Sequence, residues 1–266
     1  MSENTQSYSA KGEVSNITKR RTRFERIKIA FSKAPLSAWF GMIVLSIYLI
    51  AAFFAPFIAP HGEAEVFPVA YAPWGGEHLL GTDQIGRDIL SRLIFASRNT
   101  LGICFLACTI ALFIGTIFGI IAAIDRSYID QILSRSIDTL MAIPVMIFTF
   151  ILLSVFGPSN LNLILILGVL ESTRFFRISR SVAVGQVVLE YVEVAKLRGE
   201  KLSYIIFREI LPNIASPLIV EFGVRFIFII FTVSSLSFLG LGIQPPAADW
   251  AAMVRENAIL ILSLIH

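Results

Sequence analysis

Charged residues are scarce in this sequence. Only 15% of its 266 residues are Asp, Glu, Lys or Arg, whereas 56% are hydrophobic. Soluble domains contain about 25% charged and about 45–50% apolar residues. The mean hydropathy of +0.76 points the same way. The composition therefore excludes an ordinary soluble globular protein and predicts a polytopic membrane protein.

Sequence motifs for nucleotide binding and common catalytic sites are also lacking. There is no GxxxxGK[ST] sequence, so we expect no ATP bound through a P-loop, and GxSxG, HExxH and CxxC are missing too. Cys104 and Cys108 lie four residues apart in an apolar run, which favours two small hydrophobic side chains over a disulfide or ligand pair. His61, His78 and His266 show no metal-binding spacing. We therefore predict no catalytic, cofactor or metal site.

The first 35 residues are polar and basic. No apolar core follows within the first 30 residues, so a cleavable signal peptide is not expected. A basic cluster just before an apolar segment is typical of the cytoplasmic side, where it contacts anionic lipid, rather than of nucleic-acid binding. We predict a cytoplasmic basic tail over residues 1–35 and a membrane domain over 36–266. The cluster comprises Lys19, Arg20, Arg21, Arg23, Arg26, Lys28 and Lys33.

Five apolar segments are predicted to cross the membrane as helices. A bilayer core takes about 20 helical residues. The run of eight apolar residues before His266 is too short for a sixth crossing. The positive-inside bias places the N-terminus in the cytoplasm and residues 60–99 outside. The predicted spans are residues 39–59, 100–124, 137–156, a short one that begins near 161, and 213–242.

Small residues recur at every fourth position of the second predicted span. Such a stripe lets another helix approach closely, so this span should lie at the centre of the bundle. Pro144 is expected to kink the third span. The stripe comprises Ala107, Ala111, Gly115, Gly119 and Ala123.

Residues 80–99 have one apolar and one charged face at helical spacing. We expect an amphipathic helix at the membrane surface or beneath the spans. Its role is interpreted as structural, with a direct part in a substrate path as the alternative. The charged face carries Arg87, Asp88, Ser91 and Arg92, and the apolar face carries Ile85, Ile89, Leu93 and Ile94.

Two pairs of opposite charges lie within or beside predicted spans. Glu171 and Arg174 are three residues apart, and Glu221 and Arg225 are four residues apart. Charges at membrane depth are functional candidates by default. The alternative for the first pair is a helix end that reaches the headgroups. The second pair either neutralises itself or faces a polar cavity.

The stretch from Tyr191 to Pro212 is highly charged, although apolar segments flank it. It must lie in water, and the predicted topology places it in the cytoplasm. Gly199 should separate two short helices, and Pro212 should end the second. In that second helix, over residues 201–211, we expect Leu202, Ile205, Ile206 and Ile210 to point inward. Two interpretations of this segment remain: it is a docking element for a soluble partner, or a helix that packs only on lipid.

These residues resemble a known family. Glu193-Val-Ala195, Gly199 and Leu211-Pro212 are similar to the EAA loop of permease subunits in bacterial ABC importers, with Val194 in place of the central alanine. A second segment resembles the periplasmic signature of the dipeptide, oligopeptide and nickel permeases, particularly their second permease subunit. Its matching residues include Gly81, Asp83, Gly86, Arg87, Asp88 and Arg92.

The resemblance implies an ABC importer permease fold with six spans, so this sequence would stop before the last one. It implies a coupling loop over residues 190–213 and a bacterial inner-membrane location. The implied partners are a second permease, two ATPase subunits that bind the ATP, and a periplasmic solute-binding protein, with di- or oligopeptides as substrates. Nickel or another small solute is the alternative cargo. An ion-driven transporter, an intramembrane enzyme and a non-transporting assembly subunit are the competing classes.

Overall fold

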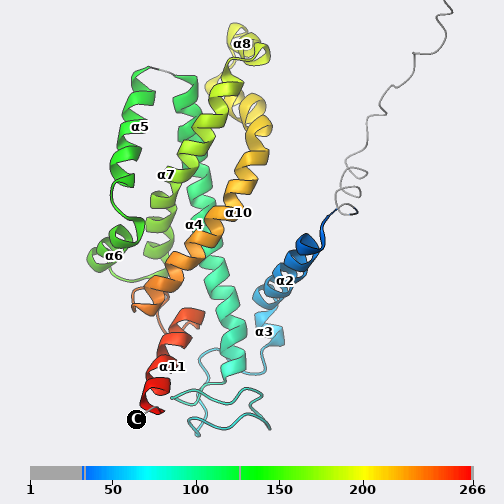
Figure 1. Ribbon diagram of the computed structural model, residues 1–266, viewed down its shortest axis with the longest axis vertical. Helices are drawn as coiled ribbons and strands as arrows, with labels where there is room; N and C mark the ends of the chain where they lie inside the picture. Colours follow the sequence, from blue (N-terminus) through cyan, green and yellow to red (C-terminus); the bar gives the residue numbers. More distant parts are fainter. Residues whose placement is uncertain (1–31, 33, 126, 265–266) are drawn as a thin grey trace, which may run out of the picture. The chain divides into compact units, whose positions relative to one another are not determined.

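The computed structural model describes residues 32, 34–125 and 127–264. Across these residues the chain is helical and contains no β-strand (Figure 1). The basic tail predicted for residues 1–35 lies almost entirely outside the described part. The elements are α2 (Leu36–Phe53), α3 (Ala55–Ile58), α4 (Ile89–Ile124), α5 (Tyr128–Met141), α6 (Val145–Phe156), α7 (Asn160–Val187), α8 (Glu190–Leu197), α9 (Leu202–Tyr204), the π-helical turn η1 (Ile205–Ile210), α10 (Leu211–Phe238) and α11 (Trp250–Leu264).

The chain divides into two compact units, residues 1–46 and 47–266, and the boundary falls inside α2. α2 is an apolar helix of 18 residues that ends at Phe53, earlier than the predicted end of the first span. Pro56 lies in the first turn of the short helix α3. Proline is tolerated in a first turn but not in a helix interior, so the helix breaks just before it.

Helices α4 and α7 run alongside one another at the centre of the second unit (Figure 1). Their contact follows the small-residue stripe. A Cβ at Gly115 would overlap the Ser172 carbonyl oxygen, and one at Gly119 would overlap the Ser179 hydroxyl. The Ser179 hydroxyl donates to the Gly115 carbonyl oxygen at 3.1 Å. The predicted central position of this helix is confirmed, because small residues let two backbones meet.

α4 is longer than the predicted second span. It begins at Ile89 and continues for 36 residues to Ile124. At 1.5 Å per residue this is about 54 Å, well beyond a hydrocarbon core of about 30 Å. The prediction of a separate amphipathic helix over residues 80–99 is therefore wrong, because residues 80–88 are not helical. Its second half is the start of α4, because no glycine or proline interrupts the helix there.

The third predicted span consists of two helices. α5 and α6 are bent by 85° relative to one another, and Pro144 immediately precedes α6, so the predicted kink is confirmed. On the neighbouring helix α7, Arg180 donates two hydrogen bonds of 2.6 Å to the carboxylate of Asp130 on α5. This two-pronged ion pair holds α5 against α7.

The helix after the charged stretch runs through Pro212, so the predicted stop at this residue is wrong. Just before it, the Leu211 N–H donates to the carbonyl oxygen of Ile206, five residues back, at the end of the π-helical turn η1. Proline is tolerated here because it lies in the first turn after this wider stretch. Residues 202–238 thus form one continuous helical stretch.

Three helical stretches of the described chain are long and apolar enough to cross a membrane: residues 36–53, 89–124 and 202–238. The bent pair of α5 and α6 is a fourth if it crosses as one span. α7 has 28 residues, which is long enough, but it also carries charged side chains. The chain is an all-α multi-pass membrane protein, and the number of five crossings stays a prediction.

Candidate functional site

The charged helix α8 sits on an apolar cluster at one end of the second unit (Figure 1). Val192 and Ala195 are completely buried, whereas Glu193 and Lys196 are exposed. The cluster beneath α8 is built from α4, α7, η1 and α10. Its members include Ile120, Ala123, Ala183, Val187, Ile205, Ile206, Ile210 and Ile214. α8 therefore presents charges outward from a fixed apolar base.

Gly199 ends this helix in a left-handed conformation, with φ of +71°. Its N–H donates to the Lys196 carbonyl oxygen, and the next N–H, from Glu200, donates to the Ala195 carbonyl oxygen. This pattern is a glycine C-terminal cap. The predicted interruption at Gly199 is confirmed, but the residue is exposed and does not share the buried side of Val192.

Polar side chains also hold α8 to its neighbours. The Tyr191 hydroxyl donates to Gln186 Oε1 of α7 at 2.7 Å and accepts from Asn213 Nδ2 of α10 at 3.2 Å. Sequence reasoning missed this link, because Asn213 is 22 residues from Tyr191 and the three residues form no motif. It connects α8 to two long helices at once.

The other residues predicted around α8 separate into two groups. Leu211 packs against the buried cluster, as do Ile205, Ile206 and Ile210, whose inward position is confirmed. Leu202 was predicted to point inward, but it is 47% exposed, so that prediction is wrong. It lies at the start of α9, where the chain has just left the Gly199 turn.

A buried ionic cluster occupies the opposite end of α4. Asp83 Oδ2 accepts from Arg87 Nε at 2.7 Å and from an Arg92 terminal nitrogen at 2.6 Å. Both arginines also reach Glu256 Oε2 of α11, at 3.2 and 2.9 Å. Glu256 was not predicted, because only the fold brings α11 to this place. We call Asp83, Arg87, Arg92 and Glu256 the ionic cluster.

The ionic cluster shows how the two faces of the predicted amphipathic segment are oriented. Arg87 and Arg92 are 7% and 2% exposed, whereas Ile85 and Leu93 on the other side are 50% and 44% exposed. The charged face is thus turned inward, not toward water. Buried charges are tolerated only when they are paired, and here two carboxylates face two guanidinium groups.

Hydrogen bonds lower the pKa values of two carboxyls near the beginning of α4, those of Asp83 and Asp88. Burial alone would raise the pKa of Asp83, but backbone and side-chain hydrogen bonds from Arg87 and a backbone bond from Ile85 lower the pKa below its usual value. Burial likewise opposes ionisation of Asp88, yet hydrogen bonds from Ser91 and His78 lower the pKa of its carboxyl.

The two signature glycines shape the loop that leads into α4. Gly81 and Gly86 have φ of +77° and +87°. A Cβ at Gly81 would overlap the Ala72 carbonyl oxygen, and a Cβ at Gly86 would overlap that of Phe67. Only glycine combines this conformation with such close approach. The structure therefore brings all six predicted signature residues together, and gives the glycines a structural reason.

The predicted intramembrane charges are arranged differently from the predicted pairs. Arg225 Nε lies 2.7 Å from Glu221 Oε1, but its N–H does not point at that oxygen, so the contact is electrostatic rather than an aligned hydrogen bond. Glu171 is 5% exposed and its Oε2 has no hydrogen-bond partner. Arg174 is exposed and forms no described ion pair with Glu171, because it points away from the buried face of α7. Glu171 interacts electrostatically with Arg225 of α10 as well as with Arg174.

Known proteins resemble this chain over most of its length. Residues 115–265 match the family of the binding-protein-dependent transport system inner membrane component, and residues 31–73 match the N-terminal TM domain of oligopeptide transport permease C. The dipeptide transport system permease protein DppC of Alkalihalophilus pseudofirmus is 34% identical over 225 residues, which is 84% of this chain and 74% of that protein. The di/tripeptide transport system permease protein DppC of Pseudomonas aeruginosa is 30% identical over 223 residues, 81% of this chain and 74% of that protein. The glutathione transport system permease protein GsiD of Pectobacterium atrosepticum is 31% identical over 238 residues, 89% of this chain and 79% of that protein.

The fold and its sites define a multi-pass helical membrane protein. It has a charged helix with exposed side chains at one end of α4 and a buried ionic cluster at the other. The matches narrow this class. The chain belongs to the family of inner membrane components of binding-protein-dependent transport systems. It is a permease of the ABC importer type rather than an enzyme, and the predicted fold class is confirmed.

Proposed function

We propose that this chain forms half of the translocation pathway of an ATP-driven importer of di- or oligopeptides. The observation that carries the proposal is the 34% identity, over 84% of the chain, to a dipeptide transport system permease protein. The proposed partners are a second permease subunit, two ATP-binding subunits and a periplasmic solute-binding protein. ATP would be bound by the partner subunits, and this chain would need no cofactor.

In this proposal, residues 190–213 couple the permease to an ATPase subunit. Glu193 on the exposed side of α8 is the proposed polar contact. Because Val192 and Ala195 are buried and Tyr191 bonds to α7 and α10, a push on α8 would be transmitted to both long helices. A two-state movement driven by nucleotide requires such a rigid connection.

The proposed orientation follows from α4. α8 contacts the cluster around Ile120 and Ala123 near the end of α4, while the ionic cluster lies at its beginning. Since about 54 Å of helix separates the ends, they lie on opposite sides of a core of about 30 Å. We place α8 in the cytoplasm, together with the N-terminus, and residues 80–99 in the periplasm of a bacterial inner membrane.

The intramembrane charges are proposed to line part of the substrate path. Peptides carry a positive and a negative terminus, so a path that presents both signs suits them better than a uniformly apolar one. Glu171 and the Glu221–Arg225 pair provide these signs on two facing helices, α7 and α10. Charged groups at membrane depth typically mark such paths.

Reconstitution of the whole importer tests the function. Proteoliposomes with the chain, its partner subunits and the binding protein should accumulate a labelled dipeptide when ATP is present, and not with a non-hydrolysable analogue. Accumulation of Ni²⁺ in place of the dipeptide would assign the chain to the nickel permeases instead. Uptake driven by a proton gradient without ATP would overturn the proposal in favour of an ion-driven transporter.

The coupling role has its own test. Glu193→Lys should reduce the amount of ATPase subunit that purifies with the permease, while the membrane level of the chain stays unchanged. Glu65→Lys is the matched control, because Glu65 is also exposed but lies at the other end of the second unit. Equal ATPase retention in both variants would contradict the assignment of α8 as the contact.

A further inference from the structure

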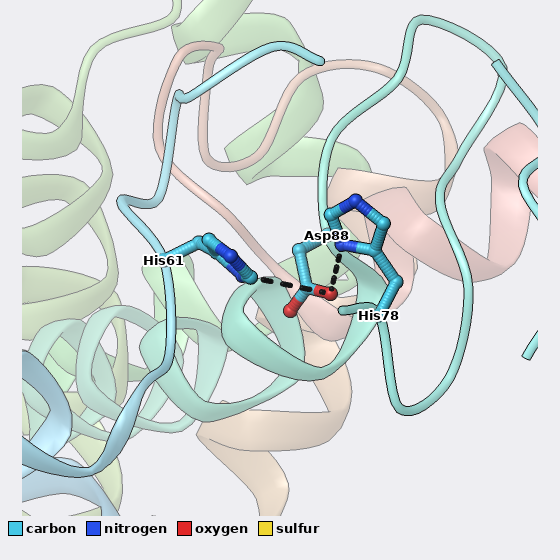
Figure 2. Close-up of side chains that lie close together, drawn as sticks. All are labelled: His61, His78 and Asp88. Carbon is cyan, nitrogen blue, oxygen red and sulfur yellow. Dashed lines mark hydrogen bonds and ion pairs between the residues drawn. The ribbon is translucent and has the colours of Figure 1, made fainter. Parts of the chain in front are cut away.

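Two histidines and one aspartate converge beside the beginning of α4 (Figure 2). His61 follows α3, His78 lies in the loop before α4, and Asp88 caps the α4 N-terminus. His78 Nδ1 is 3.0 Å from Asp88 Oδ1, and His61 Nδ1 is 3.9 Å from the same oxygen. One potential ligand atom from each residue lies within 4.8 Å of the others. Sequence spacing predicted no metal site because the loop, not a motif, brings these residues together.

The group is sheltered on one side by an aromatic ring. Phe67 packs edge-on against both imidazoles, with ring centroids 4.8 Å from His61 and 4.6 Å from His78. The side chains of His61, His78 and Asp88 are 22%, 11% and 1% exposed. An ion between them would thus be partly shielded from water but still reachable from one side.

Ser91 fixes the position of two of the three residues. Its backbone N–H donates to Asp88 Oδ2 at 2.8 Å, which leaves Oδ1 directed at the imidazoles. Its hydroxyl accepts the His61 backbone N–H at 3.0 Å. Hydrogen bonds that orient ligands in this way are typical of metal sites, where the outer contacts hold the inner ones.

The hydrogen bond between His78 and Asp88 does not explain why His61 lies beside them. The bond between His78 and Asp88 is complete without it. Yet His61 Nδ1 is buried and has no hydrogen-bond partner among the described residues, although its ring points toward the Asp88 carboxylate (Figure 2). A buried polar atom without a partner carries a free-energy cost, which a bound cation would remove.

We propose that His61, His78 and Asp88 bind one divalent transition-metal ion, with Zn²⁺ as the best fit. Two imidazole nitrogens and one carboxylate oxygen form a ligand set that zinc uses, with a fourth position left for water. Ligands at zinc distances are about 3.3–3.5 Å apart in a tetrahedron. The separations of 3.0 and 3.9 Å from Asp88 Oδ1 bracket that value, and all three ligand atoms lie within 4.8 Å of one another, so the ion would draw the two imidazoles together.

The bound ion would fasten the loop to α4. His61 and His78 belong to two parts of the loop, and Asp88 caps α4, so one ion would join both parts of the loop to the helix. Arg87, which precedes Asp88 in the chain, belongs to the ionic cluster and contacts Glu256 of α11. Metal binding would therefore stiffen the whole face on which the permease is proposed to receive its substrate. The site itself does not depend on which substrate is carried.

Metal binding is tested with the full-length chain in complex with its partner subunits in detergent. After treatment with a chelator, the wild type should bind one Zn²⁺ per chain, measured by titration against a chromogenic zinc indicator. Zinc should also raise the thermal unfolding temperature. His61→Ala and His78→Ala should each weaken binding at least about tenfold, since each removes a ligand, which matters at least as much as an outer contact. Glu65→Gln, which alters an exposed carboxylate of the same loop, should bind as the wild type does.

Binding of Co²⁺ can be measured spectroscopically in the wild type, without a substituted variant. Co²⁺ should produce the visible absorption bands of a four-coordinate site in the wild type, and Zn²⁺ should abolish them. No stoichiometric binding, or unchanged binding in both histidine variants, would overturn the proposal. Because these measurements require no transport, a failed uptake assay leaves them interpretable, and a cargo site for nickel elsewhere would survive the histidine substitutions.

Discussion

At the scale of single residues, Gly199 determines the backbone path between α8 and α9. Its φ of +71° is unfavourable for residues with a Cβ, yet no atom lies within 4 Å of where a Cβ would be. The restriction is therefore conformational rather than steric. Gly199→Ala should destabilise this turn by about 1–2 kcal/mol and lower ATP-driven peptide uptake without reducing membrane insertion.

Asparagine provides the control for Gly199, because its side chain tolerates the left-handed conformation better than alanine does. Gly199→Asn should therefore retain more uptake than Gly199→Ala, measured at equal membrane levels of the chain. An alanine variant as active as the asparagine variant would show that the conformation of Gly199 does not limit coupling.

Asp83 should make stability depend on pH. Its folded-state pKa is lowered, so its ionised form stabilises the fold above the unfolded-state pKa, and this contribution is lost as pH falls through the folded-state value. Thermal unfolding temperature should therefore fall in acid, below about pH 4. Asp83→Asn should weaken this acid dependence and lower stability at neutral pH by about 3–5 kcal/mol, because Arg92 would lose a partner.

The comparison for Asp83 is Glu256, the other carboxylate of the ionic cluster. Its side chain is 16% exposed, against 3% for Asp83, so water can replace part of its contact with the arginines. Glu256→Gln should cost less stability than Asp83→Asn at neutral pH. Unfolding measured in detergent across the pH range would contradict this account if both variants kept the acid dependence of the wild type.

At the scale of elements, the close contact between α4 and α7 depends on a position without a side chain, Gly115. At Gly115 a Cβ would meet the Ser172 carbonyl oxygen, the Phe175 Cβ and the Phe176 N–H nitrogen, none of which can rotate away. Gly115→Ala should therefore destabilise the protein by about 1–3 kcal/mol, the usual range for overpacking.

Gly102 is the matched control in the same helix. A Cβ there would meet nothing within 4 Å, so Gly102→Ala should be neutral or stabilise α4 by up to about 1 kcal/mol. The two variants differ only in position along α4, and in detergent Gly115→Ala should lower the thermal unfolding temperature whereas Gly102→Ala should leave it unchanged or raise it. Equal shifts would contradict the close contact between α4 and α7.

Elements that follow from local patterns were predictable, and elements that depend on distant contacts were not. The small-residue stripe predicted a central helix, and Pro144 predicted a kink, because both act through their own segment. The prediction that a helix ends at Pro212 was wrong, because the residue pattern gave no sign of the π-helical turn before it. The burial of the charged face with Arg87 and Arg92 was not predicted, because its partner Glu256 comes from a helix more than 160 residues later.

The same distinction applies to the sites. Ala195 and Gly199 were identified through the motif that begins at Glu193, although their separate roles in the apolar base and the helix cap are visible only in the fold. Histidine spacing gave no sign of the group around Asp88. Such a group forms only when a loop folds back on a helix end, and residue spacing along the chain does not record that.

At the scale of the whole molecule, α4 connects the proposed coupling helix α8 to the proposed periplasmic segment over residues 80–99. If it crosses the membrane, residues at its two ends must be reached from opposite sides. Lys201, beside α8, and Trp74, in the loop before α4, are both exposed, so each can be replaced by cysteine without opening the core. Cys104 and Cys108 are fully buried, so the native background should remain unlabelled.

A membrane-impermeant maleimide then distinguishes the sides. In intact spheroplasts, Trp74→Cys should be labelled and Lys201→Cys should not, and inverted vesicles should show the reverse. The reason is length, since about 54 Å of continuous helix cannot return to the side it left across a core of about 30 Å. Labelling of both cysteines from one side would mean that α4 lies along the membrane, and α8 could not then couple an internal ATPase to a path that opens outside.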